Sequence, residues 1–235
     1  EISACLVGSE MCIRDRLTDV PHFRFLDLAI VFNCLIGIDP DDISQSFSEE
    51  KISCSPSASG SSATILIHNH HLSFWNITKD DLYALACKNT PDLQHYELRN
   101  MSDVLKELLS DDDSSAILAP PAPFPMYVLS NHTKLNGSAC ILYQDLLKNF
   151  AEHLRSDLYI LPSSIHEVLI IPVNSFATPA DPLLSSANSP ADTRQQSYRE
   201  LSEMVQEVNA TQLSTEDILS DHVYYYSRES SRITM

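Results

Sequence analysis

The stretch at 159–172 constrains the fold more than any other part of this sequence. Its two apolar runs, at 159–161 and 168–171, consist of residue types that favour β-strands. Pro162 ends the first run, and a short polar segment suited to a turn follows it. The polar residues of that segment are Ser163, Ser164, His166 and Glu167. We therefore predict an antiparallel hairpin that carries these side chains at its tip.

Apolar periodicity along the rest of the chain predicts both strands and helices. Strands are predicted at 23–36, 63–72, 126–130, 138–142 and 222–227. For 23–36, a buried helix is the alternative. Helices are predicted at 78–91, 101–109, 143–154 and 201–208, and Ser214 with Asp217 suggests a short capped one. Ser-rich and Pro-rich loops are expected at 44–62 and 174–191. Strands and helices in separate runs favour an α+β fold, built from antiparallel hairpins with packed helices.

The first 16 residues resemble a translated sequencing adapter from metagenome assemblies. We expect residues 1–16 to be an artefact that adds nothing to the fold. The chain also begins at Glu1 without an initiator Met, so we expect the natural amino terminus to be missing, and the sequence makes no prediction about a targeting signal on it.

The Pro-rich segment 119–125 is expected to connect two αβ halves, at 17–118 and 126–235, which alternatively form one domain. A faint internal echo relates residues 65–70 to 127–132, because each apolar run ends in a similar Asn-His pair. Two similar halves that arose by duplication are one explanation of the echo, and coincidence is the other.

Charge and composition exclude several classes of protein. The 32 acidic and 15 basic residues give a net charge of −17, which opposes binding to a nucleic-acid backbone. The longest apolar runs, such as 28–32, are far shorter than the ~20 residues of a membrane span. Apart from those in the adapter-like segment, the cysteines show no C-x-x-C pair and are Cys34, Cys54, Cys87 and Cys140. Reduced thiols in a cytoplasmic protein are the expectation.

Four segments carry a resemblance to a known family. They are Arg24-Phe25-Leu26-Asp27-Leu28-Ala29, Ala63-Thr64-Ile65-Leu66-Ile67-His68-Asn69, residues 160–171 and Val223-Tyr224-Tyr225-Tyr226. Through them the chain resembles an uncharacterised bacterial family, a domain of unknown function found mainly in anaerobic gut bacteria. The resemblance implies no activity, substrate or cofactor, and it implies that the chain is a fragment.

Three histidines close together raise a metal hypothesis. On a strand, His68 and His70 would share one face, whereas His71 would point the other way. A third ligand would have to come from a distant residue, His132 or His166. We favour hydrogen-bonded or solvated histidines, and we predict neither a metal nor a cofactor.

The polar residues of the hairpin tip, together with Asn131, form the candidate site. Ser163 or Ser164 with His166 and Glu167 supplies the residue types of a nucleophile, a base and an orienting acid. However, catalytic triads normally gather residues from distant segments, and no nucleophile elbow is present. The alternative is a turn in which these side chains bind backbone groups.

We therefore favour a non-enzymatic binding or accessory protein of the cytoplasm that acts through another protein, with no nucleic-acid or membrane partner. The alternative is a small hydrolase or metal-dependent enzyme that uses Ser163 or Ser164, His166 and the region of His68 and His70. The sequence makes no prediction about oligomeric state.

Overall fold

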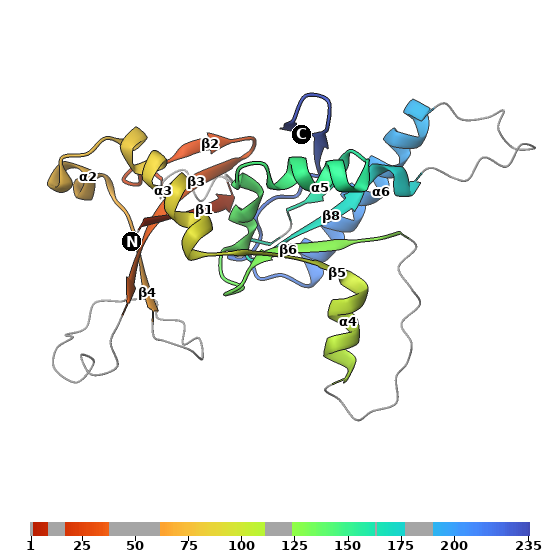
Figure 1. The fold of residues 1–235 in the computed structure, drawn as a ribbon, viewed down its shortest axis with the longest axis horizontal. Helices are drawn as coiled ribbons and strands as arrows, with labels where there is room; N and C mark the ends of the chain where they lie inside the picture. The colour runs from red at the N-terminus through yellow and green to blue at the C-terminus, as the bar shows by residue number, and fades with distance from the viewer. Residues whose placement is uncertain (1, 9–16, 38–61, 111–123, 163, 177–189) are drawn as a thin grey trace, which may run out of the picture. The chain divides into compact units, whose positions relative to one another are not determined.

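The computed structural model describes residues 2–8, 17–37, 62–110, 124–162, 164–176 and 190–235 (Figure 1). It divides into two units, Glu1–His95 and Tyr96–Met235. Most of the predicted loops at 44–62 and 174–191 lies outside the described residues, as does most of the connector at 119–125. Among the described residues, no helix has the length and apolarity that crossing a membrane requires.

The first unit is built on an antiparallel sheet in which β3 is the central strand. The strands are β1 (Ile2–Gly8), β2 (Phe23–Phe25), β3 (Leu28–Gly37) and β4 (Ser62–Leu66). One edge of β3 pairs with β1, and the other edge pairs first with β2 and then with β4. Two helices follow the sheet in the chain, α2 (Asn69–Trp75) and α3 (Lys79–Leu93).

The expectation that residues 1–16 add nothing to the fold is wrong for residues 2–8, which form β1. The strand pairs with β3 over seven residues, from Ile2 opposite Cys34 to Gly8 opposite Leu28. Leu6 is completely buried. An adapter origin for residues 1–16 stays a prediction, and residues 9–16 lie outside the described part of the chain.

Helix α3 completes the hydrogen bonding of β1. The backbone N–H of Ala4 donates to Thr90 Oγ1 over 2.9 Å, and that hydroxyl donates in turn to the carbonyl of Ala86 over 2.7 Å. Both Thr90 and Ala86 are buried. A buried backbone donor without a partner is costly, so this contact explains how β1 is accommodated beside the helix.

Two predicted strands of the first unit are shorter than expected. The strand predicted at 23–36 is a hairpin, because Leu26 adopts a positive φ of 55° and turns the chain between Phe25 and Leu28. The strand predicted at 63–72 ends at Leu66, and helix α2 begins at Asn69. Apolar runs this short do not distinguish strand from helix by periodicity alone.

The capping box predicted for α3 is confirmed. The backbone N–H of Asp81 donates to Thr78 Oγ1, and the Asp81 carboxylate accepts from the Thr78 backbone N–H. The predicted stop at Pro91 is wrong by two residues, since the helix continues to Leu93. Proline is tolerated there because, in the last turn, its missing N–H costs a single helical hydrogen bond.

The second unit contains a six-stranded antiparallel sheet in the order β10-β9-β7-β8-β6-β5. Its strands are β5 (Tyr96–Asn100), β6 (Tyr127–Asn131), β7 (Leu158–Leu161), β8 (Val168–Pro172), β9 (Tyr224–Ser227) and β10 (Arg232–Thr234). Its helices are α4 (Met101–Ser110), α5 (Leu146–Leu154) and α6 (Pro190–Thr211), with short 3₁₀ helices η2 (Gly137–Leu142) and η3 (Val173–Phe176). The predicted hairpin is confirmed, because β7 pairs with β8.

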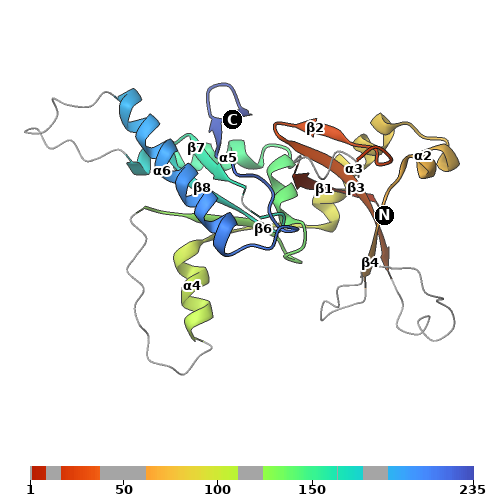
Figure 2. The same cartoon turned by 180° about the vertical axis from the view of Figure 1, so that it is seen from behind.

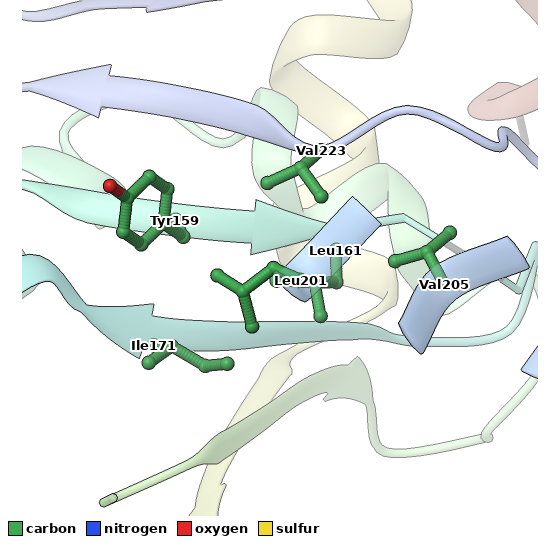
Figure 3. Close-up of a cluster of buried hydrophobic side chains, with 6 residues drawn as sticks. All are labelled: Tyr159, Leu161, Ile171, Leu201, Val205 and Val223. Atoms are coloured by element: carbon green, nitrogen blue, oxygen red, sulfur yellow. The ribbon is translucent and has the colours of Figure 1, made fainter. Parts of the chain in front are cut away.

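Alternation along the strands gives this sheet two apolar faces. Helices α5 and α6 lie on opposite sides of the sheet (Figures 1 and 2). One face packs against α6, through a cluster shown in Figure 3 that consists of Tyr159, Leu161, Ile171, Leu201, Val205 and Val223. On the opposite face, the Tyr127 ring contacts the Phe150 ring of α5 at a centroid distance of 5.0 Å. The hairpin is therefore held in a three-layer arrangement, and this explains why its residues are buried.

Several predictions for the second unit need correction. The strand predicted at 138–142 is the 3₁₀ helix η2, and Ser214 begins a turn rather than a helix. Strands β5 and β10 were not predicted from the sequence. Because β5 pairs with β6, the division between units falls at His95 and Tyr96 instead of at 119–125.

The α+β class is confirmed, since the described residues form helices and antiparallel sheets. Two similar halves are not confirmed. The echo segments lead into different structures, because β4 is followed by the α-helix α2 and β6 is followed by the 3₁₀ helix η2.

Candidate functional site

The tip of the β7–β8 hairpin is held by two distant segments of the second unit. From one side, Ser138 donates to the carbonyl of Ile165 through both its backbone N–H (3.2 Å) and its hydroxyl (2.7 Å). From the other side, the carbonyl of Asp217 accepts from the Ile165 N–H over 2.9 Å, and that of Pro162 accepts from the Ser220 N–H over 3.0 Å. The polar tip is thus a junction of three loops.

His166 uses both ring nitrogens within this junction. Its Nδ1 accepts a hydrogen bond from the backbone N–H of Asn136 at 3.3 Å, and its Nε2 lies 3.4 Å from the Asp217 carboxylate. Its backbone carbonyl also accepts from Ser130 Oγ at 2.8 Å. A general base needs a free ring nitrogen facing the nucleophile, whereas these contacts orient the ring toward structural partners.

The two serines of the tip differ in what the structure describes. Ser164 is buried, and its Oγ accepts the backbone N–H of His166 at 3.0 Å. Its backbone forms an isolated β-bridge with Ile218. Ser163 lies outside the described residues. For Ser164, the contacts are those of a hydroxyl that closes a turn.

The remaining members of the candidate site are Asn131 and Glu167. Asn131 is buried, and its amide donates to the carbonyl of Leu135 at 2.7 Å and accepts from Thr133 Oγ1 at 2.9 Å. It therefore closes the turn that leads into η2. Glu167 is exposed at the surface.

We expect Ser164→Ala to lower stability by about 1 to 3 kcal/mol, because it leaves the His166 N–H without its buried acceptor. His166→Ala should cost about 1 kcal/mol, since its ring contacts are long and the side chain is 37% exposed. Chemical unfolding followed by far-ultraviolet circular dichroism measures both. Normal stability combined with loss of a cellular phenotype would instead support the hydrolase hypothesis.

The three histidines of the first unit lie at the start of α2 and not on a strand, so the predicted shared strand face is wrong. His68 precedes the helix, and its Nδ1 lies 3.1 Å from the Asp19 carboxylate. The rings of His70 and His71 are 3.9 Å apart between centroids, and the His71 ring stacks on Trp75 at 5.4 Å. No group of three metal-binding side chains suited to an ion is found in the described part of the chain.

The described thiols include two that are deeply buried. Burial raises the pKa of Cys5 to about 12 and that of Cys140 to about 11. Both thiols are therefore protonated at neutral pH, and a protonated thiol is a poor nucleophile. Cys34 is partly buried and Cys87 is exposed.

The exposure of Phe74 was not predicted from the sequence. This side chain is 86% exposed at the end of α2, beside Trp75 at 40%. The available signal was the pair itself, because two adjacent side chains on a helix point about 100° apart, so one of them often lies at the edge of a buried face.

The fold and the junction define an α+β protein in which Ser164, His166 and Asn131 serve as turn and loop contacts. The family described as a family of unknown function (DUF5688) matches residues 1–182 and 190–228. The chain belongs to this family. No curated protein and no solved structure matches it.

Proposed function

We propose that this chain is a non-enzymatic binding or accessory protein of the cytoplasm, and that it binds another protein through the first unit. The observation that carries the proposal is the exposure of Phe74. A phenylalanine this exposed leaves most of its apolar surface in water, and exposed apolar side chains that gather in a patch mark protein interaction sites.

The first unit carries other exposed apolar side chains on the elements that precede and follow α2 in the chain. We name them the apolar surface set, which comprises Ile65, Leu66, Phe74, Trp75, Tyr83 and Leu85. They come from β4, α2 and α3 of the first unit. Aromatic side chains are enriched at the energetic centres of protein interfaces, because they bury much area at little entropic cost.

The partner we propose is a polypeptide that carries apolar side chains flanked by basic residues. The chain has a net charge of −17, so a basic partner is attracted and an acidic one is repelled. Long-range attraction of this kind raises the association rate and weakens with added salt. The same charge disfavours a nucleic-acid partner.

We expect Phe74→Ser to weaken partner binding by about 30-fold, the effect of losing a hot spot worth about 2 kcal/mol. Stability should change by less than about 0.5 kcal/mol, because the side chain is exposed. Proteins that copurify with the full chain are identified, purified and titrated against it by calorimetry at two salt concentrations.

Met204→Ser is the matched control, since Met204 is an exposed apolar residue of α6 in the other unit. The proposal requires a purified partner whose affinity falls with Phe74→Ser and with added salt, and holds with Met204→Ser. A partner that binds Phe74→Ser normally would overturn it. So would a chain that only self-associates through Phe74, which light scattering detects.

A further inference from the structure

Helix α2, which carries Phe74 and Trp75, begins with a hydrogen bond that depends on a neutral histidine. The backbone N–H of His68 donates to His71 Nδ1 over 2.9 Å. His71 thereby occupies the position that Glu or Gln takes in an ordinary capping box, three residues after the N-cap. A protonated imidazole has no acceptor nitrogen, so protonation of His71 abolishes this bond.

Two further effects make positive charge costly at this end of α2. The first helical turn contains His70 and His71 and no acidic residue, and cations at a helix N-terminus oppose the macrodipole. The rings of His68, His70 and His71 also lie within 5.9 Å of one another between centroids. Protonating one of them therefore disfavours protonating the next.

The charged and titratable groups that act on His71 come from two segments. His68 and His70 belong to its own helix region, and Asp19 comes from the segment before β2. The pKa of His71 is lowered from 6.5, first by partial burial and then by the two histidines, whereas Asp19 acts in the opposite direction. Because the folded helix favours neutral His71, its stabilising contribution is present above pH 6.5 and is lost as the pH falls below that value.

Helix α2 has few other stabilising contacts once the hydrogen bond to His71 is lost. It is seven residues long, and none of its side chains is fully buried. Helices of this length are marginal in water without capping or packing. Its other hydrogen bonds lie at its two ends. At the start, the Asn69 N–H donates to the carbonyl of Asp19 over 2.9 Å and the Asn69 amide donates to that of Thr18 over 3.2 Å. At the end, the Ile77 N–H donates to the carbonyl of Leu72 over 3.1 Å.

We propose that α2 is a pH-responsive helix, whose first turn opens when His71 is protonated and thereby changes how Phe74 and Trp75 are presented. The consequence for a partner rests on the proposed function, because it assumes that the partner binds these two aromatic side chains. The opening itself does not depend on any partner. Mild acidification should therefore reverse binding without unfolding the second unit.

The test follows hydrogen–deuterium exchange of the full chain, without partner, between pH 8 and 5, corrected for the intrinsic rate at each pH. We expect protection of amides in α2 to fall by roughly two- to thirtyfold, the range that corresponds to losing a helix cap, with a midpoint below pH 6.5. Trp75 is the single tryptophan, so its emission maximum provides a second measurement of the same event.

Three variants separate the switch from general acid sensitivity. His71→Gln keeps an acceptor that does not titrate, so the transition should disappear. His70→Gln removes a positive charge that disfavours protonation of His71, so the midpoint of the α2 transition should move to higher pH. His153→Gln, an exposed histidine of α5, should behave as the unmodified chain does.

Persistence of the transition in His71→Gln would overturn the proposal, as would unchanged protection of α2 down to pH 5. Equal loss of protection in the second unit would overturn it too, because that result means general unfolding. If the switch is found but Phe74→Ser leaves partner binding intact, the proposed function fails alone. If Phe74 is required for binding and the protection of α2 does not change with pH, the switch fails alone.

Discussion

Deleting residues 1–8 should unfold the first unit while the second unit stays folded. The deletion removes β1, which pairs with β3 along seven residues and buries Leu6 completely. Truncating one buried leucine to alanine costs about 2 to 5 kcal/mol, and the deletion removes a whole strand in addition. A small domain has only about 5 to 15 kcal/mol of stability, so the loss should exceed what the unit can tolerate.

Two separate measurements follow the folding of the two units. Trp75 emission follows the first unit, and hydrogen exchange of peptides from β7 and β9 follows the second. Leu6→Ala should lower the stability of the first unit by about 2 to 5 kcal/mol. Ile2→Ala, on the same strand with a partly exposed side chain, should cost much less. An unchanged melting curve after deletion would mean that residues 1–8 are foreign sequence without a structural role.

Gly137→Ala should destabilise the second unit by about 3 kcal/mol, at the upper end of overpacking effects. A Cβ at this position would lie 2.2 Å from Ser130 Oγ, 2.4 Å from the His166 carbonyl oxygen and 2.7 Å from the Asn131 backbone nitrogen. Two of these three atoms belong to the backbone of neighbouring segments, so no side-chain rotation relieves the clash. The substitution would force β6 and the hairpin tip apart.

Chemical unfolding followed by far-ultraviolet circular dichroism measures this cost, with Trp75 emission expected to stay unchanged. Ser130→Ala is the control, because it removes the closest atom and one hydrogen bond and should cost only about 1 kcal/mol. The double variant should remain as unstable as Gly137→Ala, since the backbone clashes persist. Full rescue by Ser130→Ala would show that the junction is looser than the distances imply.

The hairpin could be predicted because its evidence is local. Two β-type runs separated by Pro162 and a polar turn specify their own pairing, and β7 and β8 pair as expected. The role of the polar side chains at the tip could not be predicted in this way, because it depends on residues that are distant in the sequence. His166 meets Asn136 and Asp217, which are 30 and 51 positions away, and no sequence pattern relates them. The role of Gly137 is equally hidden, because only the folded chain brings Ser130 and His166 against it.

By itself, the sequence determined the α+β class, the β7–β8 hairpin, the capping box of α3 and the amphipathic helices, since each depends on residue spacing within one segment. The tertiary structure alone decided whether short apolar runs became strands or helices. Residues 138–142 form the 3₁₀ helix η2 because Ser138 bonds to the hairpin tip, and residues 2–8 form β1 because β3 offers a complementary edge. Both outcomes depend on partners distant in the chain, and hydrogen bonds to such partners override weak local preferences.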